Sequence, residues 1–374
     1  MTLFPTSNST PLRIGIIGCG KISDAYFHGL APYGEFARIT ACADLDVARA
    51  GTKASQHGVG KACSVDELLA DSEIDAVLNL TIPAAHAEIN LRALRAGKHA
   101  YCEKPFSLTY KEGLVVWREA QRRNLRVGCA PDTVLGAGIQ TCRKLIDDGV
   151  IGRPVAATAN LLCPGHESWH PSPEFYYQVG GGPLFDMGPY YLTALVTLLG
   201  PIKSVSALAK KTHEERVITS EPLKGKKISV EVPTHLCGSL EFANGVLATA
   251  TMSFDVWKHH LPMVEIYGTE GSISCPDPNG FGGEVKVWTT KNREWESVPL
   301  LHGEEMGRGL GLADMAYALQ TGQPHRASGE LALHIVETME AFHVSARTGR
   351  RATLKSTCPQ PAPLSEALPH SHQV

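Results

Sequence analysis

Short apolar runs alternate with amphipathic stretches along the first 130 residues. Runs with the length of buried strands lie at 12–17, 37–43, 75–80, 98–102 and 125–130. Segments with helical spacing lie between them, at 21–30, 46–57, 64–69, 84–96 and 109–124. Strands that alternate with helices of about ten to fifteen residues predict βαβ units and a doubly wound parallel sheet.

The pattern changes after Pro131. Helices are predicted over 133–148, 184–199, 310–320 and 329–346. Strand-like runs, some separated by turns such as Asn244-Gly245, lie at 155–162, 202–209, 235–242, 246–254, 263–267 and 284–289. The chain therefore reads as α/β overall. We expect a domain with the parallel sheet at 1–131, an α+β domain on a largely antiparallel sheet at 132–356, and a flexible proline-rich tail at 357–374.

Composition and charge exclude several classes of protein. The 374 residues are 43 % hydrophobic and 20 % charged, as in globular proteins. A net charge of -3 gives no basic surface for nucleic acid. The longest apolar stretch, 190–199, is shorter than the roughly 20 residues of a membrane helix, and the N-terminus lacks signal-peptide features. We therefore expect no membrane partner. Ten scattered cysteines without C-x-x-C read as reduced, which favours a cytoplasmic protein.

A glycine-rich turn follows the first predicted strand and opens a helix. Its sequence, Gly18-Cys19-Gly20-Lys21-Ile22-Ser23, is G-x-G-x-x-G with serine in the last place. The first glycine permits the tight turn, and the second lets a pyrophosphate approach the backbone at the helix N-terminus. We expect Gly18, Gly20, Lys21 and Ile22 to bind a dinucleotide. An ordinary glycine turn is the alternative, although the strand-turn-helix context favours the binding site.

Asp44 ends the second predicted strand, at the distance expected for a ribose-binding carboxylate. Such a carboxylate accepts hydrogen bonds from both ribose hydroxyls and repels a 2′-phosphate. No arginine directly follows it, so NAD is favoured over NADP. A helix cap is the alternative role for Asp44, and Asp46 competes for that role.

The tripeptide Glu103-Lys104-Pro105 follows the strand KHAYC. Together with the segments GIIGCGKIS, TIPAAHAEI and the stretch GGGPLFDMGPY at 180–190, it resembles the Gfo/Idh/MocA family of NAD(P)-dependent sugar oxidoreductases, over roughly 12–353. The resemblance implies a Rossmann domain, an open-faced sheet domain and a nicotinamide between them. It also implies a homo-oligomer, a dimer or tetramer, formed through the exposed sheet face. Thr81, His86, Glu103 and Lys104 join the expected cofactor site, with a locally bonded histidine as the alternative for His86.

The same resemblance assigns catalytic residues. Lys104 corresponds to the catalytic lysine and Asp186 to the active-site carboxylate, while Tyr190 stands where many members have histidine. Tyrosine serves as the acid/base group in the glucose-fructose oxidoreductase and dihydrodiol dehydrogenase branches. A phenol is a weak base at neutral pH, and a neighbouring ammonium favours the phenolate, so Lys104 and Tyr190 form a plausible pair. A core position is the alternative for Tyr190.

The segment His166-Glu167-Ser168-Trp169-His170 matches H-E-x-x-H, a zinc motif only on a helix. Flanking prolines favour a loop, so we expect no metal. The aromatic and imidazole groups suit a sugar ring, and we place His166, Trp169 and His170 near the substrate, with loop packing as the alternative. Weaker candidates are Trp257, His259, His260, Arg308 and His325.

The sequence therefore predicts an NAD-dependent oxidoreductase that acts on a secondary hydroxyl of a sugar, polyol or glycoside. One alternative keeps NAD tightly bound for a transient oxidation that permits elimination or hydrolysis of a glycosidic bond. Another is a nicotinamide-binding regulator without turnover.

Overall fold

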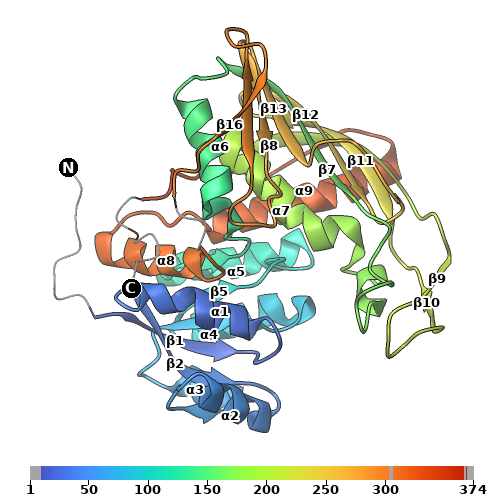
Figure 1. Ribbon diagram of the computed structural model, residues 1–374. Helices are drawn as coiled ribbons and strands as arrows, with labels where there is room; N and C mark the ends of the chain where they lie inside the picture. Colours follow the sequence, from blue (N-terminus) through green and yellow to red (C-terminus); the bar gives the residue numbers. More distant parts are fainter. Residues whose placement is uncertain (1–9, 303–305, 366–367, 369–374) are drawn as a thin grey trace. The chain divides into compact units, whose positions relative to one another are not determined.

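The computed structural model describes residues 10–302, 306–365 and 368, and Figure 1 shows their course. Contacts divide the described chain into two compact units. The first comprises residues within 1–140, 301–333 and 361–374, and the second comprises residues 141–300 and 334–360.

The first unit is built on a six-stranded parallel sheet in the order β3-β2-β1-β4-β5-β6. Its strands are β1 (Leu12–Ile17), β2 (Ala37–Ala43), β3 (Ala62–Cys63), β4 (Ala76–Asn79), β5 (His99–Cys102) and β6 (Val127–Cys129). The strand order reverses between β1 and β4, and ligands of such sheets bind where the carboxyl ends of these strands diverge. The predicted doubly wound sheet is confirmed.

The helices of the first unit begin and end at local signals in the sequence. They are α1 (Ser23–Leu30), α2 (Val47–Gln56), α3 (Val65–Ala70), α4 (His86–Arg95), α5 (Tyr110–Arg123) and α8 (Leu310–Thr321). Ser64 and Thr109 form capping boxes with Glu67 and Glu112, which satisfy backbone N–H groups at the starts of α3 and α5. Asn124 ends α5 in the left-handed conformation, with φ 55°.

The segment that contains α8 groups with the first unit, whereas the sequence analysis assigns it to the second domain. Asp132 explains the difference, because its Oδ2 accepts hydrogen bonds from the N–H groups of Gly309 and Gly311 at 2.7 and 3.1 Å. The Asp132 carboxyl is fully buried, and this burial raises its pKa. A buried carboxyl that bonds two backbone donors holds this distant segment beside the parallel sheet.

The segment 357–365 is packed, contrary to the expected flexible tail. Cys358 and Leu364 are 3 % and 6 % exposed. The Leu364 N–H donates to Gln140 Oε1 at 2.8 Å, and the Gln360 amide donates to the Thr197 carbonyl at 3.0 Å. These two hydrogen bonds and the buried side chains hold the segment in place. The rest of the expected tail, apart from Leu368, lies outside the described residues.

The second unit contains a nine-stranded sheet in the order β16-β15-β14-β13-β7-β12-β11-β8-β17. The strands are β7 (Pro154–Leu162), β8 (Ile202–Lys210), β11 (His235–Phe242), β12 (Leu247–Ser253), β13 (Val264–Gly268), β14 (Gly271–Cys275), β15 (Val285–Thr289), β16 (Trp295–Val298) and β17 (Ala352–Thr353). Neighbours pair antiparallel except β7 and β12, which are parallel. A separate hairpin joins β9 (Glu215–Val217) to β10 (Lys227–Ser229).

One face of this sheet is buried and the other carries exposed side chains. Leu236 and Leu240 of β11 are buried, and α7 (Gly182–Leu199) packs against β7, β11 and β12. Exposed apolar side chains include Leu208 and Leu247, at 70 % and 58 %. The helices α6 (Ala137–Asp147) and α9 (Gly329–Thr348) belong to this unit for most of their length. Within the described ranges, no helix combines the length and apolarity needed to cross a membrane.

Candidate active site

The turn after β1 has the shape that a dinucleotide requires. Gly18 has φ +101°, and a Cβ atom there would lie 2.7 Å from the Leu80 carbonyl carbon and oxygen. The Gly18 N–H donates to the Ala43 carbonyl at 2.9 Å. This turn is therefore pressed between the ends of β2 and β4, and glycine is required by both conformation and space.

Gly20, the second glycine of the motif, has open space beside its Cα atom. A Cβ atom there would meet nothing within 4 Å, and α1 starts three residues later without a side-chain cap. Ser23 is fully buried, and its hydroxyl donates to the Gly20 carbonyl at 2.7 Å, so serine serves in the third glycine position. Lys21 is exposed and Ile22 is half-buried at this turn. An uncapped helix start behind an open glycine fits a bound pyrophosphate.

Asp44 stands beside this turn, at the end of β2. Its Oδ2 accepts from the Cys19 N–H at 2.8 Å, and its Oδ1 accepts from the Asp46 N–H at 3.0 Å. Asp46 caps α2, because its side chain accepts from the N–H groups of Ala48 and Arg49. Asp44 is therefore not the cap of α2. Its position fits the ribose hydroxyls of NAD, together with the glycine turn.

Arg49 is a residue that the sequence analysis missed. Its guanidinium lies 3.5 Å from Asp44 Oδ1, from the first turn of α2. The sequence does contain a signal for it, because Arg49 follows Asp44 by five residues. The predicted preference for NAD over NADP rests only on Asp44 and the residues directly after it. Asp44 therefore has a cation beside it as well as two backbone N–H groups.

The two glycines yield a matched pair of predictions. Gly18→Ala is expected to lower the free energy of unfolding by about 2 kcal/mol or more, because φ is positive and the backbone of Leu80 is too close. Gly20→Ala is expected to keep wild-type stability and to weaken NADH binding by about 10-fold or more, because its methyl group stands at the open face. Urea denaturation and NADH fluorescence titration measure the two effects. Wild-type NADH affinity in Gly20→Ala would contradict this placement of the pyrophosphate.

Glu103 holds the turn that carries Lys104. Its Oε2 accepts from the Lys104 N–H at 2.9 Å, and its Oε1 accepts from the Tyr26 hydroxyl at 2.9 Å. The guanidinium of Arg308 lies 3.4 Å from the same Oε1. Glu103 is thus occupied with chain contacts, which makes it a positioning residue for Lys104. Arg308, one of the weaker substrate candidates, thus forms an ion pair with the Glu103 carboxylate.

His86 joins two loops at the carboxyl ends of the strands. Its Nδ1 lies 2.7 Å from the Pro105 carbonyl oxygen and its Nε2 lies 2.9 Å from the Thr81 carbonyl oxygen. The side chain is 1 % exposed, and burial lowers its pKa. The Thr81 hydroxyl in turn donates to Asn79 Oδ1 at 2.6 Å. These contacts favour the local structural role for His86, since both ring nitrogens face backbone carbonyls.

In the second unit, α7 carries Asp186 and Tyr190 one helical turn apart. Pro183 occupies its first turn, as is common at helix starts, and Gly182 has φ +80°. Tyr190 is 3 % exposed, and the neighbouring Tyr191 is 1 % exposed. The side chain of Asp186 is 16 % exposed.

An imidazole from the preceding loop meets Asp186. The Nε2 atom of His166 lies 3.2 Å from Asp186 Oδ2. Three aromatic rings surround this imidazole, with ring centroids 5.3 Å away for Trp169, 4.2 Å for Tyr176 and 4.6 Å for Phe254. The sequence analysis named His166 and Asp186 separately, and the structure brings them together as a pair.

The H-E-x-x-H residues lie in the loop between β7 and the 3-10 turn at 174–177, and their side chains take separate partners. Glu167 Oε1 lies 2.6 Å from an Arg216 nitrogen, and the Tyr177 hydroxyl donates to the same carboxylate. The His170 ring lies against Phe175 and Tyr176, while Trp169 is 60 % exposed. No group of three or more candidate ligands gathers around a metal position in the described part of the chain.

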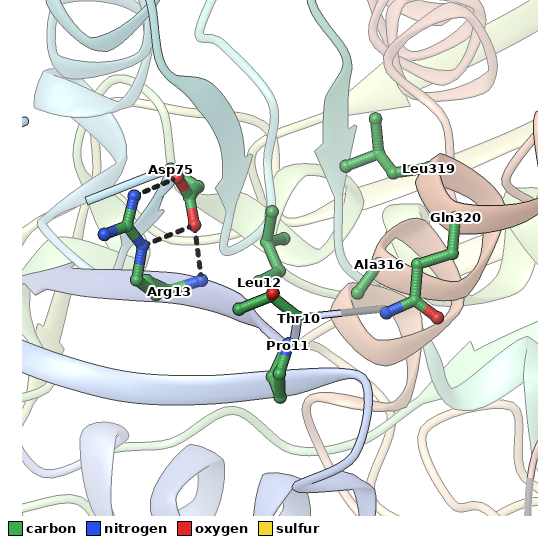
Figure 2. A pocket seen from close by; sticks show the side chains of 8 residues that line it. All are labelled: Thr10, Pro11, Leu12, Arg13, Asp75, Ala316, Leu319 and Gln320. Carbon is green, nitrogen blue, oxygen red and sulfur yellow. Dashed lines mark hydrogen bonds and ion pairs between the residues drawn. The ribbon is translucent and has the colours of Figure 1, made fainter. Parts of the chain in front are cut away.

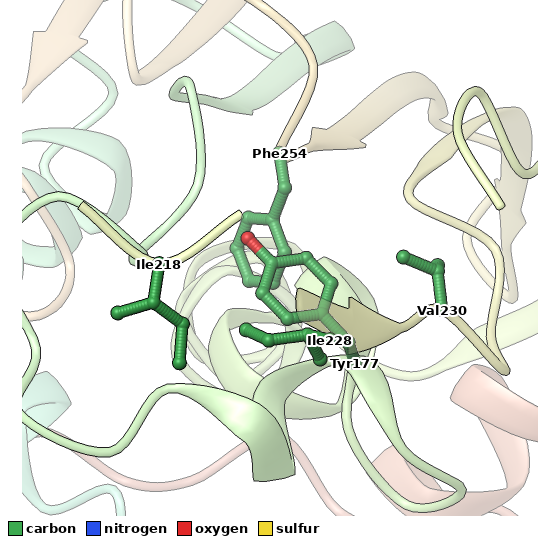
Figure 3. Packing of buried hydrophobic residues seen from close by; sticks show 5 residues of the cluster. All are labelled: Tyr177, Ile218, Ile228, Val230 and Phe254. Atoms are coloured by element: carbon green, nitrogen blue, oxygen red, sulfur yellow. The ribbon is translucent and has the colours of Figure 1, made fainter. Parts of the chain in front are cut away.

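Arg216 is the second residue that the sequence analysis missed. From β9 it donates to Glu167, to Asp255 and to the carbonyls of Pro164 and Phe254. Figure 3 shows the apolar cluster beside it, which consists of Tyr177, Ile218, Ile228, Val230 and Phe254. The β9–β10 hairpin therefore clamps the loop that carries His166.

Removing this clamp is expected to destabilise the unit. Arg216 is 9 % exposed, so Arg216→Met leaves the carboxylates of Glu167 and Asp255 buried without their cation. We expect a loss of about 3 kcal/mol in the free energy of unfolding. Lys226→Met is the matched control, since Lys226 also joins the hairpin to the loop, through Glu174, but is 57 % exposed and should cost less than about 1 kcal/mol. Equal losses in both variants would contradict the assigned role of Arg216.

The remaining candidates lie elsewhere. His325 is buried, with Nε2 3.1 Å from the Val127 carbonyl, and burial lowers its pKa to about 4. Trp257 is 87 % exposed in the loop after β12, close along the chain to His259 and His260. These positions favour a core role for His325.

A pocket of about 420 Å³ also lies in the first unit, as Figure 2 shows. It is lined by residues at the start of β1 and by α8, and inside it Arg13 pairs with Asp75. The pocket lies at the amino end of β1, whereas Gly18 follows the carboxyl end of the same strand. This pocket is therefore separate from the glycine turn at Gly18 and Gly20.

Both parts of the chain match models of one family. Residues 12–130 match the model described as "Oxidoreductase family, NAD-binding Rossmann fold", and residues 139–274 match the "GFO/IDH/MocA C-terminal domain". Inositol 2-dehydrogenase 3 of Saccharopolyspora erythraea is 32 % identical over 295 residues, 75 % of this chain and 79 % of the relative. The 1,5-anhydro-D-fructose reductase of Ensifer adhaerens is 29 % identical over 354 residues, 92 % and 99 % of the two chains. A levoglucosan dehydrogenase solved with NADH shares the fold, with a TM-score of 0.81 and 22 % identity over 93 % of this chain and 100 % of that one.

Proposed function

The chain belongs to the GFO/IDH/MocA family of oxidoreductases with an NAD-binding Rossmann fold, and from that premise we propose that it oxidises or forms a secondary hydroxyl of a neutral sugar or glycoside. The observation that carries the substrate class is the Asp186–His166 pair set among aromatic rings. Sugar rings present apolar C–H faces and hydroxyl edges, which such a mixture of π faces and polar groups complements. Relatives with names of inositol and anhydrofructose enzymes support the same class.

The cofactor would be held by the glycine turn and by Asp44. Gly18 and Gly20 leave the backbone open to a pyrophosphate, and the Asp44 carboxylate suits ribose hydroxyls rather than a 2′-phosphate. When bound, the nicotinamide supplies the hydride acceptor or donor for the substrate carbon. The chain's own residues then have to bind the sugar, orient it and move the hydroxyl proton.

We assign proton transfer to Lys104 and Tyr190. The ammonium of Lys104 favours the charged form of a phenol, which a phenol needs in order to accept a hydroxyl proton near neutral pH. Glu103 fixes the backbone of the lysine turn, and α7 fixes Tyr190 and Asp186 on one helix face. Asp186 and His166 hold the sugar by its hydroxyls. A homo-oligomer formed through the exposed sheet face and a cytoplasmic location remain predictions from the sequence.

The reaction is tested by following NADH absorbance with NAD and NADP in parallel, across monosaccharides, inositols and glycosides. We expect reduction of NAD by one class of neutral sugar. NADH that stays bound while a glycosidic bond is cleaved would instead show the transient oxidation. Cofactor binding without turnover on any sugar would contradict the proposed reaction and favour a regulator.

A further inference from the structure

The two ring nitrogens of His166 are in different situations. Nε2 lies 3.2 Å from Asp186 Oδ2, whereas Nδ1 is buried and has no hydrogen-bond partner among the described residues. A carboxylate only accepts hydrogen bonds, so Nε2 carries the proton in this contact. In the neutral imidazole the lone pair is therefore on Nδ1, because the contact of one nitrogen selects the tautomer.

A buried lone pair without a donor costs free energy. Burying a polar group without a hydrogen bond is unfavourable, and such groups in folded proteins normally have a partner. The rings of Trp169, Tyr176 and Phe254 around the imidazole do not supply a strong donor by their π faces. Of the three, Trp169 is the most open to solvent, at 60 % exposed.

The charges around His166 favour a neutral donor over an anion. The charged groups on the packed elements are Asp186 on α7, Glu167 in the same loop, Arg216 on β9 and Asp255 after β12. Three carboxylates therefore accompany one guanidinium, which is already bonded to two of them. The titratable Cys163 thiol and Tyr177 hydroxyl also lie on these elements, and burial raises the pKa of both. A phosphate or carboxylate ligand would be repelled here, while a hydroxyl would not.

The position of the imidazole is fixed before any ligand arrives. Arg216 holds Glu167, the residue next to His166, and the backbone carbonyl of Glu167 accepts from the N–H groups of Thr219 and Ser220 at 2.8 and 3.0 Å. Asp186 holds the ring from the other side. An acceptor held in this way loses little conformational freedom when a donor binds, which favours selectivity.

We propose that Nδ1 of His166 accepts a hydrogen bond from a substrate hydroxyl other than the one that reacts, and that this contact makes a free hydroxyl at that position a requirement. The proposal rests on the proposed function, in which Lys104 and Tyr190 serve the reacting hydroxyl. It deepens that function by defining the substrate class as neutral sugars with a donor hydroxyl at one further ring position. A site built to bond a hydroxyl rejects the deoxy analogue strongly, because its own polar group is then left unpaired.

Two variants of His166 separate the functions of its nitrogens. In His166→Gln the amide nitrogen takes the place of Nε2 and donates to Asp186, but no acceptor stands at the Nδ1 position. In His166→Asn the amide oxygen stands near the Nδ1 position. The exposed His213, in the connection between β8 and β9, provides the control His213→Asn. Thermal unfolding of all variants shows whether each one folds.

The experiment combines these variants with single-deoxy analogues of the best sugar from the panel. For each non-reacting position, kcat/KM is measured, and calorimetry gives the affinity of the sugar for the NADH complex. In wild type, one deoxy position is expected to cost about 10- to 100-fold in both quantities. In His166→Gln that penalty is expected to fall below about 3-fold, with the other positions unchanged, and His166→Asn is expected to retain part of it.

The outcomes distinguish this inference from the proposed function. A wild-type enzyme that turns over sugars while His166→Gln lowers all of them equally, with every deoxy penalty intact, overturns the role of Nδ1. So does wild-type behaviour of His166→Gln. A wild-type protein that neither turns over nor binds any neutral sugar overturns the proposed function itself.

Discussion

Replacement of Lys104 by methionine is expected to lower kcat/KM for the sugar by about 1,000-fold, within the 10²–10⁴ range that general acid-base groups contribute. Methionine keeps the length and the apolar stem of lysine but removes the ammonium to which we assign the stabilisation of the Tyr190 phenolate. The fold of the turn should survive, since Glu103 binds the backbone N–H of residue 104. NADH binding measured by fluorescence should therefore change much less than turnover.

Two controls keep this result specific to the acid-base pair. Lys111→Met removes an exposed lysine from α5 and should leave kcat/KM within about 2-fold of wild type. Tyr190→Phe should lose activity as Lys104→Met does, whereas Tyr191→Phe, which removes the hydroxyl of the next residue, should not. Retention of more than about a fifth of the activity in Lys104→Met would exclude Lys104 from proton transfer.

Replacement of Asp44 by serine is expected to reverse the cofactor preference. The loss of a charged acceptor should weaken NAD binding by about 10- to 100-fold. The loss of its negative charge should strengthen NADP binding by a similar factor, because Arg49, 3.5 Å from Oδ1, then lies beside the 2′-phosphate instead of a carboxylate. The ratio of kcat/KM with NAD to kcat/KM with NADP should therefore fall by about 1,000-fold.

Asp46 provides the control for the cofactor experiment. Its side chain caps α2, so Asp46→Ala should cost about 1 kcal/mol in the free energy of unfolding and leave the NAD-to-NADP ratio unchanged. The double variant Asp44→Ser with Arg49→Ala should lose the gain with NADP. A preference of the wild-type protein for NADP would contradict the role assigned to Asp44.

The elements with strong local signals are predictable from the sequence. The apolar strand at 12–17, its glycine turn and the carboxylate at residue 44 identify the nucleotide end of the parallel sheet before any tertiary contact is known. Asp46 and Asp44 could not be separated in that way. Both stand within one turn of α2, and only the hydrogen bonds show that Asp46 caps the helix while Asp44 binds the Cys19 N–H.

The clamp that Arg216 forms on the loop that carries His166 could not be predicted. The strands β9 and β10 have three residues each, too few for a hydrophobic period to be visible. Arg216 meets Glu167 across 49 positions of the chain, and a charged residue in such a segment reads as a solvated surface position. The pairing of His166 with Asp186 likewise depends on where the loop folds back.

The place of the segment around α8 was also beyond local reasoning. Its helix was predicted, but its attachment depends on the bonds from Gly309 and Gly311 to Asp132, which lie 177 and 179 positions apart. A helical period indicates that a helix buries one face, and it does not identify the partner of that face.

The central claim, hydride transfer between a sugar carbon and the nicotinamide, is tested most directly by isotope transfer. The sugar that gives the highest rate with NAD is supplied with deuterium on all its ring carbons, and the reduced cofactor is isolated and weighed by mass spectrometry. Our account predicts one deuterium in each released reduced cofactor and one keto group in the product sugar. Reduced cofactor without deuterium, or a changed sugar with no released reduced cofactor, would contradict it.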